Sequence, residues 1–451
     1  MYSVGLYTLG CKVSSYETEA VGESFERLGF AVTPFEEKND VYVINTCTVT
    51  AESDAKSRKY IRRAVRKNPR AVVVVIGCYG QRSPDEVAEI DGVSVVLGTR
   101  DKLRAADYAV MLLSLRDGVS IETISDKLPK SARLTERGKI IDVSALAGAE
   151  FEKMKISRAP RTRGYVKIQD GCECKCSYCA ISDARGPVRS KSKLEVIDEV
   201  EALYKGGTRE IVLTGIETGS YRDGECDLAE LLEELDRRHS CDRIRLGSMA
   251  PELIGEKFIT RVGRLSIMVP HFHVSMQSAS DNVLRAMRRR YTSARALENI
   301  ERIREYMPSA MFTADLMVGF PGETDADFRD TFSFVSRARL LDAHVFAYSK
   351  REGTPAADFP NQVPESVKRE RSAALIDEVR RVRDEVLSEA VSRGEPLSVV
   401  FETRSSGRYH GHSDSYIEVS ATSDVDVRGE IACVAPGYAK DGVIYGKILN
   451  L

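Results

Sequence analysis

Four cysteines stand close together near the middle of the chain, in the run Gly171-Cys172-Glu173-Cys174-Lys175-Cys176-Ser177-Tyr178-Cys179. Taken as Cys172, Cys176 and Cys179, they follow Cys-x3-Cys-x2-Cys and supply three thiolates, whereas a cubane iron-sulfur cluster has four irons. One iron would therefore lack a protein ligand. A structural zinc site is the alternative, but zinc takes four ligands, usually in two pairs, and no fourth Cys or His follows at such a spacing. The spacing favours an iron-sulfur cluster with one open iron.

The same run resembles the cluster loop of the radical-SAM superfamily, in which S-adenosylmethionine (SAM) chelates the open iron and is cleaved to a 5′-deoxyadenosyl radical. In that motif an aromatic residue typically precedes the last cysteine, and Tyr178 fills this place. The resemblance implies that Cys172, Cys176 and Cys179 carry the catalytic cluster, that Tyr178 lies beside the cofactor, and that Cys174 is a bystander. Spacing alone leaves open a competing Cys-x4-Cys pairing of Cys174 with Cys179.

The first 120 residues or so alternate between strand-like apolar runs and helical stretches. Continuous β-branched strands separated by helices indicate an open parallel sheet covered on both faces. Cys11, Cys47 and Cys78 each follow the end of one of the first three main strands, and the carboxyl ends of parallel strands lie along one edge. We therefore expect these three cysteines to converge as ligands of a second cluster. The alternative is three buried small hydrophobic residues, since free Cys is commonly buried.

Motifs along the whole chain resemble the methylthiotransferases. The amino-terminal ones surround the three separated cysteines, and the later ones surround the cysteine loop and the strand ends that follow it. They are Thr8 to Val13, Asn45 to Thr50, Gly77 to Tyr79, Gly171 to Cys179, Ala184 to Ser190, Val318 to Thr324 and Tyr348 to Pro355. The resemblance implies two 4Fe-4S clusters on one chain, one held by Cys11, Cys47 and Cys78.

Six further strand and helix units follow between about residues 160 and 390, and they resemble the partial (βα)6 barrel of radical-SAM enzymes. Chemistry in such barrels lies on loops at the carboxyl ends of the strands. Gly215 and Glu217 follow the second strand, where Glu217 could meet the SAM ammonium or be a solvated loop acid. Gln277 follows the fourth strand and is a candidate for the SAM carboxylate or ribose.

The last part of the chain changes to short β-rich runs after Gly394-Glu395-Pro396 and resembles the TRAM domain, a small β-barrel associated with RNA binding. Arg404, Arg408, Tyr409 and Tyr416 interleave cations with aromatic rings, which suits phosphate contact and base stacking. The surface of any small barrel could look similar. The His410/His412 and His271/His273 pairs lack further ligands and read as structural residues rather than metal sites.

A second basic surface is predicted near the amino terminus, where residues 56 to 70 hold eight basic side chains and no acidic one. On a helix, Arg58, Arg62 and Arg66 stack at four-residue steps, with a neighbouring row of Lys and Arg. A solvated helix face is the usual explanation of such charge, but unpaired cations in two rows repel one another and a polyanion would relieve that cost. We therefore expect RNA, here tRNA, as the partner of both surfaces.

The length of 451 residues suggests about three domains. We expect a methylthiotransferase domain over residues 1–125, a linker over 126–157, the radical-SAM domain over 158–390 and the TRAM domain over 391–451. The start of the chain lacks a signal-peptide pattern and the longest apolar run, residues 71–76, is too short to cross a bilayer, so a cytoplasmic protein without membrane contact is expected.

Together the motifs most resemble the methylthiotransferase branch that acts on N6-threonylcarbamoyladenosine at position 37 of tRNA, in the anticodon stem-loop. The resemblance implies methylthiolation of adenine C2 with two SAM molecules, and a low-potential electron donor such as flavodoxin or ferredoxin. The branch that acts on isopentenyladenosine and the branch that modifies a ribosomal-protein aspartate are the alternatives. A non-catalytic iron-sulfur protein that binds RNA is a further one, against which the open iron argues.

Overall fold

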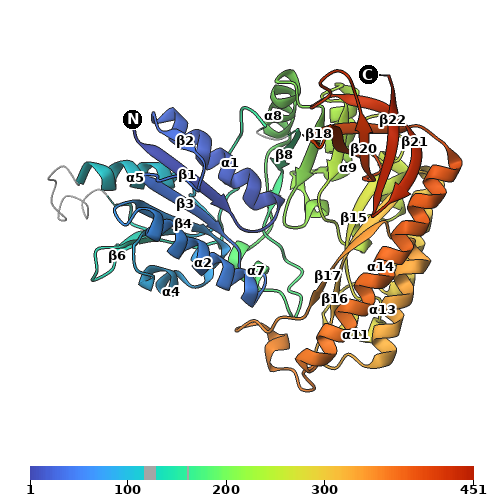
Figure 1. The fold of residues 1–451 in the computed structure, drawn as a ribbon. Coiled ribbons are helices and arrows are strands. Elements are labelled where there is room, and N and C mark those ends of the chain that lie inside the picture. The colour runs from blue at the N-terminus through green and yellow to red at the C-terminus, as the bar shows by residue number, and fades with distance from the viewer. Residues whose placement is uncertain (116–127, 160–161, 451) are drawn as a thin grey trace.

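The structure is a computed structural model that describes residues 1–115, 128–159 and 162–450 (Figure 1). It confirms the predicted class: an amino-terminal α/β sheet domain, a central partial barrel and a small carboxy-terminal β-barrel. The predicted boundary between residues 125 and 126 lies outside the described residues. No helix of the described part of the chain is long and apolar enough to cross a membrane.

The first domain is built on one sheet with the strand order β2-β1-β3-β4-β5-β7-β6. Neighbouring strands are parallel except for β7 and the edge strand β6, which pair antiparallel. Its central strands are buried along their whole length, as their unbroken Val and Ile runs predict. The strands are β1 (Ser3–Thr8), β2 (Ala31–Thr33), β3 (Val41–Thr46), β4 (Val72–Gly77), β5 (Val93–Leu97), β6 (Ala132–Leu134) and β7 (Ile140–Asp142).

Helices cover both faces of this sheet, and each face has its own apolar core. The core on one face contains Phe25, Leu113 and Val43. The core on the other face contains Ile61 and Ala64. Side chains alternate across a strand, so successive residues of β3 enter opposite cores. The helices are α1 (Lys12–Arg27), α2 (Ala51–Lys67), α3 (Cys78–Arg82), α4 (Pro84–Glu89) and α5 (Arg104–Leu115).

The segment predicted as a linker is partly structured. Strands β6 and β7 lie within residues 126–157, and β7 pairs with β5 through Val95 and Ile140. The sheet therefore extends beyond the predicted first domain: Ile140 and Ile141 of β7 are buried, and β6 forms the edge beyond them.

The central domain holds six parallel strands in a curved row. Three-stranded sheets β14-β11-β8 and β15-β16-β17 are joined by the isolated bridges Ile244↔Met268 and Met249↔Val274. The strands are β8 (Arg163–Lys167), β11 (Glu210–Thr214), β14 (Arg243–Leu246), β15 (His271–Gln277), β16 (Met311–Val318) and β17 (Asp342–Ala347). Their order along the row follows the chain, as expected for repeated βα units.

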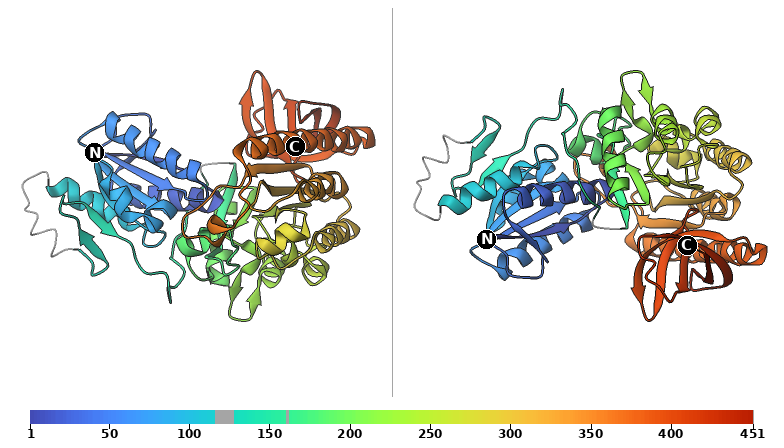
Figure 2. Two further views of the ribbon diagram at one scale, coloured as in Figure 1. Left: turned by 90° about the horizontal axis from the view of Figure 1, so that it is seen from below. Right: turned by 90° about the horizontal axis from the view of Figure 1, so that it is seen from above.

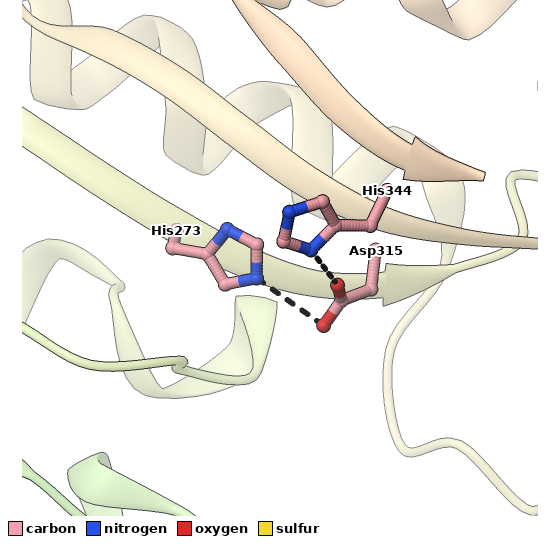
Figure 3. A group of neighbouring side chains, drawn as sticks. All are labelled: His273, Asp315 and His344. Carbon is pink, nitrogen blue, oxygen red and sulfur yellow. Dashed lines mark hydrogen bonds and ion pairs between the residues drawn. The ribbon is translucent and has the colours of Figure 1, made fainter. Parts of the chain in front are cut away.

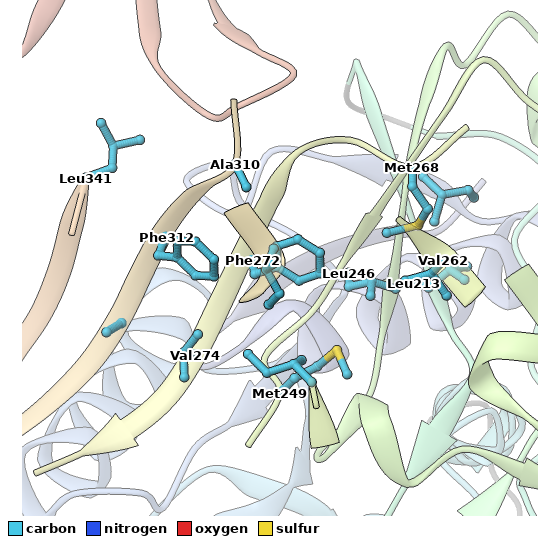
Figure 4. Close-up of a cluster of buried hydrophobic side chains, with 14 of the residues drawn as sticks. Leu213, Leu246, Met249, Val262, Met268, Phe272, Val274, Ala310, Phe312 and Leu341 are labelled. Carbon is cyan, nitrogen blue, oxygen red and sulfur yellow. The ribbon is translucent and has the colours of Figure 1, made fainter. Parts of the chain in front are cut away.

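Apolar side chains from these strands and their covering helices form one continuous core, in which Phe272 stacks on Phe312 with ring centroids 5.9 Å apart (Figure 4). The helices are α7 (Ile181–Arg185), α8 (Lys193–Lys205), α9 (Leu228–Arg237), α10 (Glu256–Val262), α11 (Asp281–Ala286), α12 (Ser293–Tyr306) and α13 (Asp325–Ala338). Short elements in the connections are β9 (Gln169–Asp170), β10 (Arg189–Ser190), β12 (Arg222–Asp223), β13 (Cys226–Asp227), η1 (Thr218–Ser220), η2 (Pro251–Leu253) and η3 (Pro355–Asp358).

The long helix α14 (Glu365–Arg393) leads to the carboxy-terminal barrel, which closes in the order β18-β19-β20-β22-β21 (Figure 2). Leu375 and Val386 of this helix belong to the same core as Phe401 and Val434 of the barrel. The strands are β18 (Leu397–Ser405), β19 (Arg408–Ser413), β20 (Glu418–Thr422), β21 (Ile431–Lys440) and β22 (Val443–Asn450). The sequence predicts four of them, at residues 397–402, 416–419, 429–434 and 442–448, and misses β19.

Helix α1 joins the first domain to the central barrel at β8 (Figure 1). Its residue Tyr16 is buried in the barrel core and donates a hydrogen bond to Glu199 Oε1 at 3.0 Å. The next residue, Glu17, is fully buried, and its carboxylate accepts hydrogen bonds from Lys102, Lys167 and Arg185. An apolar contact and a buried charge network therefore fix the position of the first domain against the barrel.

Candidate active site

The structure brings the three separated cysteines together at one edge of the first sheet. Cys11 directly precedes α1, Cys47 follows β3, and Cys78 is the first residue of α3. Strands β1, β3 and β4 are adjacent and parallel, so their carboxyl ends share one edge. All three cysteines line the same cavity. The expected convergence is present, and their role as cluster ligands stays a prediction.

The cysteine loop of residues 171–179 follows β9 and ends just before α7. Gly171 takes a φ of +79°, and a Cβ added there would lie 1.9 Å from the carbonyl oxygen of Pro187. Only glycine fits this position. Cys172, Cys176 and Cys179 line the cavity, and Cys174 lines it with them, so the geometry does not separate the bystander from the predicted ligands.

The cavity has a volume of about 610 Å³ and lies between the first domain and the barrel. This size is ordinary for a small-molecule site. At its rim, Arg351 Nη2 donates to Asp54 Oδ2 at 2.6 Å and to Thr48 Oγ1 at 2.7 Å. The loop after β17 therefore contacts the start of α2, and both cysteine triads face one open cavity.

Burial favours the protonated thiol at two of the predicted ligands unless a metal or a cation compensates for it. Burial raises the pKa of Cys47 and of Cys179 to about 11 in each case. Two arginines touch sulfur directly: Arg185 Nε lies 3.3 Å from Cys78 Sγ, and Arg289 Nη1 lies 3.5 Å from Cys176 Sγ. Each triad thus has one guanidinium that stabilises a thiolate, the form that ligates iron.

The predicted SAM contacts also face the cavity. Tyr178, Gly215, Glu217 and Gln277 all line it. Gly215 packs closely on Gln169, because an added Cβ would lie 2.5 Å from Gln169 Oε1. Gln277 takes a left-handed φ of 64° beside an irregularity in the pairing of β15. Such backbone strain in a non-glycine residue is typical of functional sites.

Glu217 is a buried acid on the cavity wall. Its Oε1 accepts a hydrogen bond from the backbone N of Ala250 at 3.1 Å, while its own backbone N donates to Gln169 Oε1. Burial raises the pKa of Glu217 to about 8. A buried carboxyl of this kind favours a cationic ligand, because an ammonium group beside it stabilises the carboxylate. The predicted contact with the SAM ammonium fits this environment.

A polar group that the sequence did not predict lies deeper in the barrel. His273 of β15, Asp315 of β16 and His344 of β17 come from neighbouring strands, and both imidazoles hydrogen-bond to the carboxylate at 3.2 Å (Figure 3). Their ligand atoms lie within 4.8 Å of one another, a spacing that a divalent metal could use. His273 had been grouped with His271 in the sequence, and its true neighbours are remote in the chain.

Comparison with known proteins identifies the family. The radical SAM superfamily model matches residues 166–335, and the model of the uncharacterized protein family UPF0004 matches residues 3–98. The threonylcarbamoyladenosine tRNA methylthiotransferase MtaB of Bacillus subtilis is 39% identical over 444 residues, which cover 96% of this chain and 93% of that protein. The chain belongs to the radical-SAM methylthiotransferase family.

Two further relatives belong to this family. MtaB of Thermotoga maritima is 35% identical, with 85% of this chain and 83% of that protein covered. The tRNA-2-methylthio-N(6)-dimethylallyladenosine synthase of Alkaliphilus oremlandii is 32% identical, with 84% and 78% covered. Membership implies a radical-SAM enzyme that uses a 4Fe-4S cluster and SAM. The cysteine loop, with thiols facing the cavity at the end of the first barrel strand, fits such a cluster.

Among solved structures, the radical S-adenosylmethionine methyltransferase TsrM from Kitasatospora setae, with cobalamin and a [4Fe-4S] cluster bound, aligns with a TM-score of 0.58. It shares 18% sequence identity, and the alignment covers 79% of this chain and 74% of that chain. This likeness confirms the radical-SAM fold of the methylthiotransferase and nothing finer.

The predicted RNA contacts on helix α2 of the methylthiotransferase are only partly free. Arg58 donates to Tyr79 Oη at 2.9 Å and pairs with Glu86. In the neighbouring row, two cations pair with Glu36, so the expectation that all six cations are unpaired was wrong. Arg62 and Arg66 are exposed and keep the predicted role as candidates.

The predicted RNA contacts in the carboxy-terminal barrel need correction at both tyrosines. Tyr409 is 1% exposed and packs edge-on against Phe401, so it cannot stack on a base. Tyr416 lies between the rings of His271 and His412, at centroid distances of 4.4 and 4.8 Å. These stacked imidazoles occupy its ring, and Tyr416 therefore joins the small barrel to the central one.

The two arginines of that prediction lie on the surface of the small barrel. Arg404 is exposed, whereas Arg408 is half-buried and donates to the Ser420 hydroxyl at 2.8 Å and to its carbonyl oxygen at 2.9 Å. Of the two, Arg404 is the more available to a phosphate, and RNA contact at both stays a prediction.

Proposed function

We propose that the protein methylthiolates adenine C2 of N6-threonylcarbamoyladenosine at position 37 of tRNA, using two 4Fe-4S clusters and two molecules of SAM. The observation that carries this proposal is the shared cavity: two cysteine triads from separate domains face one space of about 610 Å³. The relatives named for threonylcarbamoyladenosine tRNA support the substrate, at up to 39% identity over nearly the whole chain.

The two triads have different roles in this proposal. Cys172, Cys176 and Cys179 would hold the cluster that, with SAM, would supply radical chemistry, and Cys11, Cys47 and Cys78 would hold the cluster that carries the sulfur. The residues of this chain position the reactants. Glu217 receives the SAM ammonium, Arg289 and Arg185 stabilise cysteine thiolates, and the rim contacts of Arg351 keep the two sides of the cavity together.

A cytoplasmic location and a low-potential electron donor such as flavodoxin or ferredoxin are part of the proposal. Radical formation needs one electron per turnover from outside the chain. The anticodon stem-loop of tRNA would bind at the mouth of the cavity, with Arg62, Arg66 and Arg404 as candidate phosphate contacts.

The deciding experiment is mass spectrometry of nucleosides from tRNA after incubation with anaerobically reconstituted protein, SAM and reductant. One tRNA carries threonylcarbamoyladenosine and a parallel one carries isopentenyladenosine. A methylthio mass gain on the first alone supports the proposal. Gain on the second alone would assign the substrate of the dimethylallyladenosine relatives, which at 32% identity make this the second candidate.

Two variants test the division of roles between the triads. Cys47→Ala is expected to abolish methylthiolation but to keep reductive cleavage of SAM to 5′-deoxyadenosine. Cys176→Ala is expected to abolish both. Loss of SAM cleavage in Cys47→Ala, with the iron at Cys172, Cys176 and Cys179 intact, would contradict separate roles.

A further inference from the structure

The polar group inside the barrel is aligned by strand register. Asp315 stands directly opposite His344 in the β16–β17 pair, and Thr313 stands opposite His273 in the β15–β16 pair. His273, Asp315 and His344 all line the cavity that holds the cysteines. Figure 3 shows each imidazole contacting one oxygen of the Asp315 carboxylate, His273 at Oδ2 and His344 at Oδ1. This group is therefore a wall of the proposed substrate cavity.

The two histidines differ in how many of their ring nitrogens take part in hydrogen bonds. His273 is buried, and both of its ring nitrogens are used: Nδ1 lies 2.8 Å from Thr313 Oγ1 and Nε2 lies 3.2 Å from Asp315. His344 uses only Nδ1 toward Asp315, and its side chain is 78% exposed. Its Nε2 is turned away from Asp315 in Figure 3. His344 lines the cavity, and within the described part of the chain no hydrogen bond uses its Nε2.

A second basic side chain contributes to the same cavity. Lys12, the first residue of α1, lines the same cavity and is close enough to act on the pKa of both His344 and His271. The hydrogen bond to Asp315 raises the pKa of His344, against burial and the Lys12 charge, which favours the imidazolium. The two cations come from different domains and face one space.

An anion suits this site better than a metal. Hydrogen bonds from His273 and His344 overcome the effect of burial and hold the pKa of Asp315 well below its usual range. Its two oxygens thus already accept hydrogen bonds from two imidazoles, and Lys12 would repel a further cation. An anionic oxygen would instead gain charge-assisted hydrogen bonds from both cations.

We propose that His344 and Lys12 form a carboxylate-binding subsite, which takes the carboxylate of the threonylcarbamoyl group while the adenine lies between the two cysteine triads. This inference rests on the proposed function. The threonylcarbamoyl group ends in a free carboxylate, whereas the isopentenyl group is a hydrocarbon. The subsite would offer charge-assisted hydrogen bonds to the carboxylate and none to the hydrocarbon, so it would separate the two substrates. A tRNA phosphate offers the same chemistry and must be distinguished by experiment.

The first variant is His344→Asn. The Asn amide can replace Nδ1 as the donor to Asp315, but it removes Nε2 and the positive charge. Lys12→Gln is the companion variant on the other domain. His239→Asn is the matched control, because His239 is an exposed residue just after α9. Each protein is reconstituted with iron and assayed for SAM cleavage, which shows that a variant is folded and loaded.

The measured quantity is kcat/KM for methylthiolation of two tRNAs, one with threonylcarbamoyladenosine and one with its carboxamide analogue. On the carboxylate substrate we expect His344→Asn to lose about 10- to 100-fold, as for a charge-assisted hydrogen bond. Wild-type kcat/KM on the carboxamide should be lower than on the carboxylate by a similar factor. The kcat/KM of His344→Asn should be about the same on the two substrates. His239→Asn should match wild type on both.

Three outcomes would overturn the subsite. Wild-type rates for both His344→Asn and Lys12→Gln would show that neither cation holds the substrate. An equal loss for the variants on the carboxylate and the carboxamide would exclude recognition of charge. Weaker binding of unmodified tRNA, by the same factor, would assign the cations to a phosphate. If wild type itself does not modify threonylcarbamoyladenosine, the proposed function is wrong, and the subsite with it. If wild type modifies this substrate but the variants give one of the three results above, only the subsite is wrong.

Discussion

Replacing Glu17 by Gln tests whether the buried charge network fixes the first domain on the barrel. Glu17 is fully buried, and its Oε1 accepts from Lys102 at 3.1 Å, from Lys167 at 2.7 Å and from Arg185 at 2.6 Å. Gln keeps the shape and can accept one of these hydrogen bonds. It removes the negative charge that three buried cations share.

The magnitude follows from burial. Removing one partner of a buried ion pair costs about 3–5 kcal/mol, because the remaining charge is left desolvated without compensation. Asp170 still pairs with Lys167 and Arg185, which places the expected cost near the lower end of this range. A domain of 150–250 residues loses roughly 2–4 °C in Tm per kcal/mol, so the transition should fall by at least ~6 °C.

The assay is thermal unfolding followed by far-UV circular dichroism on anaerobic, reconstituted protein. The matched control is Glu52→Gln, which removes the same charge from an exposed pair with Lys56 and should leave Tm unchanged. The double variant Glu17→Gln/Lys102→Gln restores the charge balance and should cost less than the sum of the two single variants. A Tm for Glu17→Gln equal to that of the control, or strict additivity in the double variant, would refute the reasoning.

Three other outcomes are expected. Gly171→Ala should prevent cluster assembly, seen as lost iron and lost visible absorbance, because the added Cβ would lie 1.9 Å from a carbonyl oxygen; Gly29→Ala, also at positive φ but with nothing within 4 Å, should assemble normally. Cys174→Ala should keep SAM cleavage whereas Cys176→Ala loses it, and the reverse would change the ligand register. Although burial opposes it, Arg185 and the two lysines hold the pKa of Glu17 well below the ordinary value of 4.5. The Tm difference between wild type and Glu17→Gln should therefore persist above about pH 4.5 and shrink as the pH falls below it.

The placement of the amino-terminal cysteines could be predicted from the sequence because it depends on topology alone. In a parallel sheet every strand delivers its carboxyl end to the same edge, so a residue just after β1 and one just after β3 must approach each other. The convergence of Cys11, Cys47 and Cys78 could therefore be predicted without any information on side-chain contacts. The same holds for the cysteine loop after the first barrel strand.

The His273, Asp315 and His344 group could not be predicted because it depends on register between strands. The register pairs Asp315 with His344, and a shift by one residue would turn His344 to the opposite face. Within the sequence each residue is an isolated polar side chain in an apolar run. Their common face becomes visible only when three strands are aligned.

The error at Tyr409 has a related cause. Cations and aromatic residues alternate in β19, and this composition alone suits an RNA-binding surface. Strand alternation, however, turns Tyr409 and Gly411 inward while Arg408 and His410 point outward. A Cβ at Gly411 would lie 2.0 Å from the Val400 carbonyl oxygen, so two strands approach closely here. Composition predicted an RNA-binding surface here. Because β19 was not predicted as a strand, Tyr409 was assigned to the exposed face instead of the buried one.

Helix α1 connects these separate features. It begins just after Cys11, presents Lys12 to the cavity, and carries Tyr16 and Glu17 into the barrel interface. A helix is rigid over two turns, so a shift at Glu17 moves Cys11 with it. Loss of the buried charge should therefore damage the amino-terminal triad before the cysteine loop, whose strand lies within the barrel. We expect Glu17→Gln to lower methylthiolation more than SAM cleavage, and equal loss of both would mean that α1 does not link domain docking to the position of this triad.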